Sequence, residues 1–192
     1  MDQLGGGAER RRFFRDSFGT WVRRTMERTE GRLVQERRFR PPGSLPEVAF
    51  LAACTRCGEC GPVCPVHAIL TVPPAGGLAA GTPYLDPKSQ PCVACADMPC
   101  VAACPTGALT KPEQGWANYR LATVEFVPER CVTFRGTPCQ VCVDACPMGT
   151  QALVSDPAGH PVLRREGCVG CGVCMRECIS FPSSFELRPA EG

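Results

Sequence analysis

CTRCGECGPVCP, at residues 54–65, holds four cysteines in the spacing C-x2-C-x2-C-x3-C and ends in a proline. Three further groups follow it: CVACADMPCVAACP at 92–105, CVTFRGTPCQVCVDACP at 131–147 and CVGCGVCMRECI at 168–179. We number the four groups motifs 1 to 4; together they use all 16 cysteines of the chain. Their first cysteines lie about 38 residues apart, which indicates an internally repeated unit rather than scattered thiols.

The composition of the 192-residue chain favours short elements joined by tight turns. Glycine and proline each occur 20 times, a content that excludes a helical bundle or a coiled coil. The net charge of +2 and the presence of two histidines argue against a nucleic-acid-binding protein with a wholly basic surface. The longest apolar run, Val48–Cys54, is too short for a membrane span of roughly 18 residues.

The segments between the cysteine groups predict the secondary structure of each repeat. PVHAI at 65–69, PTGAL at 105–109 and the residues around 151–153 predict short helices after the fourth cysteine of a motif. Strand-like stretches with turn signals lie at 81–85, 122–127 and 160–163. We therefore expect a repeated order of cysteine loop, helical turn and hairpin.

Three chemistries use thiols in such numbers. A disulfide framework belongs to small secreted domains, and no cleavable apolar signal region precedes the motifs. Structural zinc sites set two C-x2-C pairs apart with a long spacer, which four compressed groups do not offer. The run C-x2-C-x2-C-x3-C-P is the spacing of bacterial [4Fe-4S] sites, in which the fourth cysteine ligates a second cluster. The sequence therefore predicts four [4Fe-4S] clusters.

At these motifs the chain resembles polyferredoxins, and more narrowly the ferredoxin-type NapG/MauM family. The likeness rests on RPPGSLPEVAFLAACTRCGECGPVCP at 40–65, CVACADMPCVAACPTGAL at 92–109, the C-x7-C-x2-C-x3-CP motif at 131–147 and REGCVGCGVCMREC at 165–178. The resemblance implies a soluble four-cluster protein of nitrate or methylamine respiration. Such a protein passes electrons between a quinol-oxidising membrane partner and a terminal oxidoreductase.

The N-terminal segment departs from the family's pattern. Arg11, Arg12 and Phe14 preserve an RR-x-F trace of a twin-arginine export signal, but residues 16–40 are densely charged where an apolar stretch would follow. We therefore expect a cytoplasmic protein, which could also associate with the membrane surface. The alternative is a periplasmic protein exported by a degenerate twin-arginine signal.

A basic arm is predicted at residues 1–40, which hold 11 arginines against 6 acidic residues. Its apolar residues recur at helical spacing and predict an amphipathic helix over 10–39; they are Phe14, Phe18, Trp21, Val22 and Met26. This helix either packs on its own domain or docks on anionic lipid or an acidic subunit.

Two aromatic residues and two histidines stand outside the motifs. Trp116 and Tyr119 are predicted to cover a cluster, with electron relay as the alternative. His67 and His160 are predicted to be solvated or hydrogen-bonded, with proton coupling as the alternative. No catalytic residue is predicted, because no substrate site or organic-cofactor motif is present in the sequence.

The pairing of the motifs follows from their spacing. Motifs 2 and 3 are both widened while motifs 1 and 4 are compact, and like spacing suggests like partners. The resemblance to four-cluster electron-transfer subunits, in which an inner ferredoxin unit is inserted in an outer one, agrees with this nested pairing. The predicted ligand sets are Cys54, Cys57, Cys60 with Cys178; Cys168, Cys171, Cys174 with Cys64; Cys92, Cys95, Cys100 with Cys146; and Cys131, Cys139, Cys142 with Cys104. Consecutive pairing of the motifs is the alternative.

The predicted fold is α+β, with two nested bacterial-type ferredoxin modules behind the basic arm. The outer module comprises residues 41–75 and 155–188, the inner module residues 76–154, and residues 189–192 form a tail. The predicted function is a single-electron relay that serves redox protein partners as a subunit or accessory of a larger oxidoreductase. The alternatives are a zinc-stabilised interaction scaffold and a maturation or docking accessory whose clusters are structural.

Overall fold

The computed structural model describes residues 38–189, so residues 10–37 of the helix predicted at 10–39, with its docking or self-packing role, lie outside the described residues. The last residues of the predicted arm already belong to the folded region. Phe39 forms an antiparallel bridge with Leu85, and Arg40 is 8% exposed. Within the described range, no helix is both long enough and apolar enough to cross a membrane.

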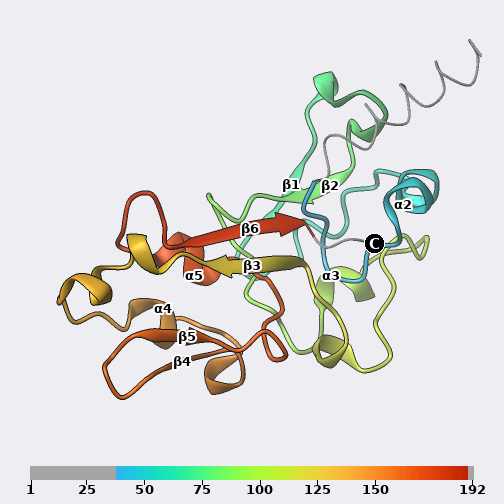
Figure 1. The fold of residues 1–192 in the computed structure, drawn as a ribbon. Coiled ribbons are helices and arrows are strands. Elements are labelled where there is room, and N and C mark those ends of the chain that lie inside the picture. Colours follow the sequence, from blue (N-terminus) through green and yellow to red (C-terminus); the bar gives the residue numbers. More distant parts are fainter. Residues whose placement is uncertain (1–37, 190–192) are drawn as a thin grey trace, which may run out of the picture. The chain divides into compact units, whose positions relative to one another are not determined.

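The first unit, residues 38–119, surrounds motifs 1 and 2 (Figure 1). Its elements are α2 (Glu47–Ala53), β1 (Ile69–Thr71), the 3-10 helix η1 (Pro74–Ala79), β2 (Pro83–Leu85), α3 (Pro99–Ala102) and η2 (Gly115–Ala117). Strands β1 and β2 pair antiparallel, with Leu70 opposite Tyr84. The segment after motif 1 is thus joined directly to the segment before motif 2.

The two ends of the first unit meet at Gly43. The Thr110 N–H donates to the Gly43 carbonyl at 2.7 Å, and the Leu45 N–H donates to the Ala108 carbonyl at 3.1 Å. Gly43 has a φ of +73°, and a Cβ there would lie 2.2 Å from the Thr110 carbonyl oxygen. Glycine is therefore required where these two backbone segments approach each other.

A buried arginine fastens α2 to the hairpin of the first unit. Arg40 pairs with Glu47 at 2.6 Å and donates to the Thr82 hydroxyl at 2.9 Å and the Pro83 carbonyl at 2.7 Å. Its guanidinium also lies 4.7 Å from the centroid of the Phe50 ring, which is fully buried. The planar fork of arginine suits this set of acceptors, which a lysine ammonium would not match.

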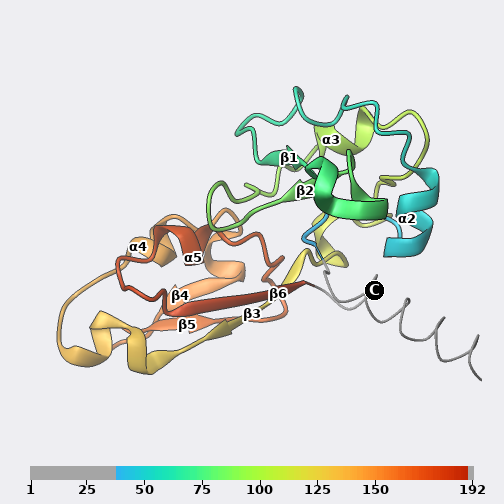
Figure 2. The same ribbon diagram turned by 90° about the horizontal axis from the view of Figure 1, so that it is seen from above.

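The second unit, residues 120–189, surrounds motifs 3 and 4 (Figure 2). Its elements are β3 (Ala122–Phe126), η3 (Pro128–Arg130), η4 (Val132–Arg135), α4 (Val141–Asp144), η5 (Gly149–Gln151), β4 (Leu153–Ser155), β5 (Pro161–Leu163), α5 (Val173–Glu177) and β6 (Phe185–Pro189). Strands β4 and β5 form the hairpin between the motifs, and β3 pairs antiparallel with β6. The alternating burial of β3, with Ala122 and Val124 inside, places its apolar face on the core.

The two units share a hydrophobic core. Val169 and Val173 of motif 4 are buried in the same cluster as Phe50 and Met98 of the first unit. The Leu121 N–H donates to the Val169 carbonyl at 2.8 Å. The units are therefore packed together rather than joined by a free linker.

The predicted strands at 81–85, 122–127 and 160–163 are confirmed by β2, β3 and β5. The prediction of helices after the fourth cysteine is wrong for motifs 1 and 2, where turns follow it; η5 is the counterpart after motif 3. The α-helices of motifs 2, 3 and 4 instead precede the fourth cysteine. The three intervening residues form one helical turn there, because a turn of 3.6 residues fits the C-x3-C spacing.

The nested arrangement is also wrong, because the structure joins the motifs consecutively. The predicted inner module, 76–154, would separate β2 from β1, yet these strands pair with each other. Motif spacing carries no information about the hairpins, and it is the hairpins that bring neighbouring motifs together.

Candidate metal centres

Four cavities of about 20 Å³ each lie within the described residues, and four cysteines line every one of them. We name them the first outer cavity (Cys54, Cys57, Cys60, Cys104), the first inner cavity (Cys64, Cys92, Cys95, Cys100), the second inner cavity (Cys146, Cys168, Cys171, Cys174) and the second outer cavity (Cys131, Cys139, Cys142, Cys178). All sixteen predicted ligands thus face a cavity.

The cavities correct the predicted pairing of the motifs. Each combines the first three cysteines of one motif with the fourth cysteine of the neighbouring motif, so motif 1 is paired with motif 2 and motif 3 with motif 4. The fourth cysteine does cross to the other site, as predicted. Cys178 lies with motif 3, however, and Cys104 lies with motif 1, because each pair of motifs shares one folded unit.

Short helices carry cysteines into two adjacent cavities. Cys100 on α3 lines the first inner cavity, while Cys104, one turn later, lines the first outer cavity. Cys174 on α5 and Cys178 divide in the same way between the second inner and second outer cavities. Residues i and i+4 lie on one face of a helix, so a single turn places both thiols along the boundary between two cavities.

The first outer cavity combines buried and exposed thiols. Burial raises the pKa of Cys60 to about 11, helped by the nearby charges of Cys54, Cys57 and Cys104. Burial alone would also raise the pKa of Cys104. Hydrogen bonds to Cys104 from the Leu109 N–H, at 3.4 Å, and from the Thr106 N–H and hydroxyl outweigh the effect of burial. The pKa of Cys104 therefore lies below its usual value.

The first inner cavity is covered by an aromatic side chain. Trp116 is 9% exposed, lines the cavity, and donates from its indole Nε1 to the Cys95 carbonyl at 2.7 Å. Its ring packs edge-on against Tyr119, with centroids 5.9 Å apart. Backbone N–H groups point at two thiols of this cavity, Ala68 at Cys64 (3.3 Å) and Ala94 at Cys92 (3.4 Å).

The second inner cavity is lined by cysteines and apolar residues, and no charged or hydroxyl side chain is among these lining residues. The charge of Arg120 partly offsets the raised pKa of Cys168. Val124 of β3 and Leu153 of β4, which belong to two different sheets, also line it. Burial raises the pKa of Cys171 to about 11 and raises that of Cys174 still further. Without a bound metal, Cys171 and Cys174 would stay protonated at neutral pH, so a metal is needed to hold them as thiolates.

The second outer cavity has several hydroxyl groups. The Thr133 hydroxyl lies 3.2 Å from the Cys131 sulfur, and the Ser184 N–H donates to the Cys178 sulfur at 3.4 Å. Burial would raise the pKa of Cys178, but hydrogen bonds from Ser184 and its neighbours lower it below its usual value. The Ser184 Oγ is fully buried against this cavity and has no hydrogen-bond partner among the described residues.

The thiols link the cavities in one line. The charge of Cys171 contributes to the raised pKa of Cys92, which burial brings to about 12, so the two inner cavities are neighbours. Within the first unit Cys100 interacts with Cys60, and within the second unit Cys174 interacts with Cys142. The order is therefore first outer, first inner, second inner, second outer.

This donor set fits a polynuclear cluster. Across residues 38–189, no three histidine, cysteine, aspartate or glutamate side chains lie close enough together to bind a single metal ion. A tetrahedral zinc would draw four sulfurs to about 2.3 Å from one centre. Four thiols spread around a cavity, with backbone N–H groups directed at sulfur, match the ligands and hydrogen bonds of an iron-sulfur cluster instead.

The predictions for the two aromatic residues and the two histidines outside the motifs are confirmed only in part. Trp116 covers a cysteine site, as predicted, with Tyr119 packed against it. His67 is exposed. His160 is instead stacked on Phe134 with ring centroids 4.0 Å apart, and its Nδ1 is buried without a hydrogen-bond partner in the described part of the chain.

Sequence reasoning missed the polar residues that line the outer cavities. Thr106 and Thr133 each lie two residues after a cysteine, and Arg56 lies two residues after Cys54. The sequence alone shows that these three residues lie close to a cysteine ligand. Ser184 is six residues from Cys178, and the sequence held no signal for its position because the chain folds back through β6 to place it.

Two comparisons with known proteins bear on these sites. The family described as 4Fe-4S dicluster domain matches residues 53–108 and 91–150. The methylamine utilization ferredoxin-type protein MauM of Paracoccus denitrificans is 34% identical over 82% of this chain and 74% of its own length. The chain belongs to the NapG/MauM ferredoxin-type family.

Two further members of the NapG/MauM family match the chain over a similar share of its length. The ferredoxin-type protein NapG of Escherichia coli is 34% identical over 79% of this chain and 71% of its own length. MauM of Methylophilus methylotrophus is 33% identical over 95% of this chain and 88% of its own length. As a NapG/MauM ferredoxin-type protein, the chain is an iron-sulfur electron-transfer protein with four [4Fe-4S] clusters.

The first dicluster match coincides with the pairing in the structure, since residues 53–108 span motifs 1 and 2. The second match, 91–150, spans motifs 2 and 3, which lie on either side of the boundary between the two units. The second dicluster match therefore does not coincide with either unit.

Proposed function

We propose that this chain relays single electrons through four [4Fe-4S] clusters, in the order of the four cavities, between redox protein partners. The observation that carries the proposal is the line of four cavities of equal volume, each bordered by four thiols. Neighbouring cavities are close enough for their thiols to affect one another, as Cys92 and Cys171 do across the two units. No catalytic residue is assigned, because the reaction chemistry belongs to the partners.

In this proposal the cysteines of each cavity are the ligands of one cluster. When bound, each cluster accepts and releases one electron at a time. The protein fixes the positions of the thiolates, and N–H groups such as those of Ala68 and Ala94 stabilise their negative charge. Trp116 and the apolar walls of the inner cavities exclude water from the middle of the line.

The partners are proposed to meet the two outer cavities. Cys57 of the first outer cavity is exposed, and Val141 and Ile179 of the second outer cavity are 39% and 60% exposed. Both ends of the line thus reach the protein surface. We propose a quinol-oxidising membrane subunit at one end and a terminal oxidoreductase at the other, in keeping with relatives named ferredoxin-type and methylamine utilization proteins.

The test begins with anaerobically purified protein. We expect about 16 iron and 16 inorganic sulfide per chain, and uptake of about 4 electrons in a coulometric titration. A colourless zinc protein would support an interaction scaffold, and about 8 iron after full reconstitution would overturn the four-cluster relay. A fully loaded protein that exchanges no electrons with its co-purified partners would support a maturation or docking accessory.

A further inference from the structure

One backbone position is shared by three of the four motifs. Two residues after the first cysteine stand Arg56 in motif 1, Ala94 in motif 2 and Gly170 in motif 4, with φ values of 61°, 52° and 70°. Glycine adopts this left-handed conformation freely, whereas any side chain disfavours it. Motif 4 shows that glycine suffices for the turn, so the long side chain of Arg56 is retained against a backbone preference.

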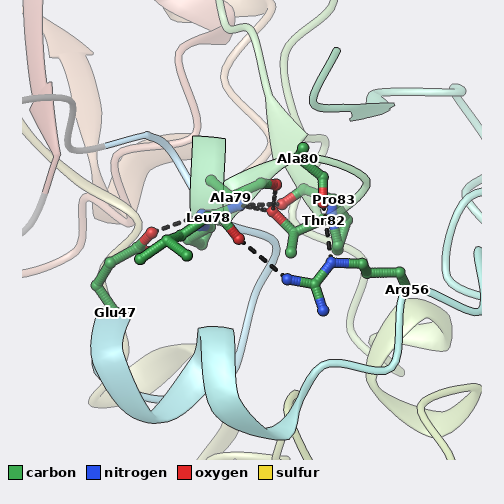
Figure 3. Close-up of polar contacts among 8 residues, drawn as sticks. Glu47, Arg56, Leu78, Ala79, Ala80, Thr82 and Pro83 are labelled. Carbon is green, nitrogen blue, oxygen red and sulfur yellow. Dashed lines mark hydrogen bonds and ion pairs between the residues drawn. The ribbon is translucent and has the colours of Figure 1, made fainter. Parts of the chain in front are cut away.

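The Arg56 side chain is held by backbone carbonyls (Figure 3). Its Nε donates to the Ala80 carbonyl at 2.9 Å, and its two Nη atoms donate to the Leu78 carbonyl at 3.0 Å and the Cys54 carbonyl at 3.2 Å. These acceptors are neutral, and within residues 38–189 no carboxylate forms an ion pair with Arg56. The positive charge is therefore fixed in position and is not neutralised by a partner in this region.

The turn at 78–81 leaves room for this side chain. Gly81 has a φ of +77°, and a Cβ there would lie 3.2 Å from Arg56 Cδ. The aliphatic part of Arg56 thus runs along the Gly81 backbone, and its position is set by contacts on both sides. Arg56 also lines the first outer cavity together with Cys54 and Cys57.

Of the four cavities, the first outer one is the one whose lining includes a charged side chain. The charge of Arg120 partly offsets the raised pKa of Cys168 in the second inner cavity, but Arg120 is not among the residues that line that cavity. A cluster with four thiolates carries a charge of about −2 when oxidised, and adding one electron makes it more negative by one unit. A fixed positive charge nearby stabilises the reduced form more than the oxidised form.

We propose that Arg56 is a positioning residue that raises the reduction potential of the cluster in the first outer cavity. This inference rests on the proposed function for the presence of that cluster, but not on any partner. It makes the two ends of the relay chemically different, since the guanidinium stands at one end and uncharged residues line the other.

The test is a redox titration of the loaded protein with dithionite and mediators, followed by electron paramagnetic resonance. Arg56→Gln removes the charge but keeps an amide donor, Arg56→Lys keeps the charge but loses the planar fork, and Arg56→Gly relieves the backbone. A matched control, Arg188→Gln, removes an exposed charge from β6 that lines none of the cavities. Cys104→Ser identifies which of the four components belongs to the first outer cavity.

Arg56→Gln and Arg56→Gly are expected to lower one potential, so that the ratio of oxidised to reduced cluster rises about tenfold, which is 59 mV for one electron. Arg56→Lys and Arg188→Gln are expected to leave it near the wild-type value. The difference between wild type and Arg56→Gln is expected to shrink at high salt, because the charge is exposed.

An unshifted potential in Arg56→Gln overturns the role of Arg56. An equal shift in Arg56→Lys and Arg56→Gln also overturns it, because the hydrogen bonds and not the charge would then be responsible. Failure of the proposed function is distinguishable from both results. It would appear in the wild-type protein as an iron content well below 16 per chain or as components that take up no electrons.

Discussion

The outer and inner cavities are built from the same four-cysteine arrangement but have different surroundings. Thr55, Arg56 and Thr106 line the first outer cavity, and Thr133, Ser180 and Ser184 line the second. The inner cavities, as far as residues 38–189 are concerned, are lined by cysteine, apolar and aromatic side chains. Cysteine spacing therefore decides where a cluster is held, and the residues next to the cysteines decide how easily it is reduced.

The pKa values of the thiols follow this division only in part, because burial also raises the pKa of Cys60 and Cys142, in the outer cavities, to about 11. Burial raises the pKa of Cys92 to about 12 and those of Cys100 and Cys171 to about 11, all in the inner cavities. The two thiols whose pKa is lowered, Cys104 and Cys178, both lie in outer cavities and both accept hydrogen bonds. Hydrogen bonds thus stabilise negative charge on one thiol at each end of the line. We expect the outer clusters to have the higher potentials.

The largest expected effect comes from removing one ligand from either class of site. Cys178→Ser is expected to disrupt the cluster held with Cys131, Cys139 and Cys142, and to leave about 12 iron per chain. Cys146→Ser is expected to disrupt the second inner cluster and to block electron passage between the two ends. Iron analysis and paramagnetic resonance of each variant measure both effects.

A spectral change in Cys178→Ser confined to the cluster of motif 4, held by Cys168, Cys171 and Cys174, would contradict the consecutive pairing. So would a change at the cluster of Cys54, Cys57 and Cys60, which the nested pairing predicts. Either outcome would remove the basis for distinguishing outer from inner sites.

An intermediate effect is expected at the cover of the first inner cavity. Trp116→Ala removes a buried aromatic side chain, and we expect a loss of about 3–5 kcal/mol of stability. Trp116→Phe keeps a ring but loses the hydrogen bond to the Cys95 carbonyl, which is worth about 1 kcal/mol. The temperature at which the iron-sulfur absorbance bleaches should fall much further for alanine than for phenylalanine. Equal losses would mean that the indole N–H, and not the ring, protects the inner site.

The smallest expected effect concerns the hydroxyl groups of the second outer cavity. Thr133→Val and Ser184→Ala each remove one hydroxyl near the cluster, and we expect the potential of that cluster to fall by about 20–60 mV. Ser155→Ala is the matched control, because its hydroxyl is also buried and has no hydrogen-bond partner among the described residues, but Ser155 lines none of the four cavities. A redox titration that finds all three variants equal to wild type would show that hydroxyl groups do not separate the outer from the inner sites.

Much of the fold and the site was predictable from the sequence because cysteine spacing is a direct consequence of cluster geometry. The sixteen facing thiols and the strand at 122–126, with its alternating burial, are examples. The position of the helices was not predictable from the proline that follows motifs 1 to 3. A single helical turn between Cys100 and Cys104 is too short for an amphipathic pattern to reveal it.

The partner of each motif could not be inferred from the likeness of spacings. Motifs 2 and 3 are both widened, but β1 and β2 form a hairpin between motifs 1 and 2, and β4 and β5 form one between motifs 3 and 4. Short-range backbone pairing therefore outweighs any similarity between distant motifs. The position of the Ser184 hydroxyl could not be predicted for a related reason, since it depends on how β6 pairs with β3.

The consecutive pairing has a consequence for biosynthesis. Partner cysteines lie at most about 50 residues apart, as Cys54 and Cys104 do, so the first unit has all of its thiols before the ribosome has made motif 3. The ligand sets of the first two sites are therefore complete while the rest of the chain is still being translated. In a nested chain, Cys54 would have had no partner until Cys178 was made.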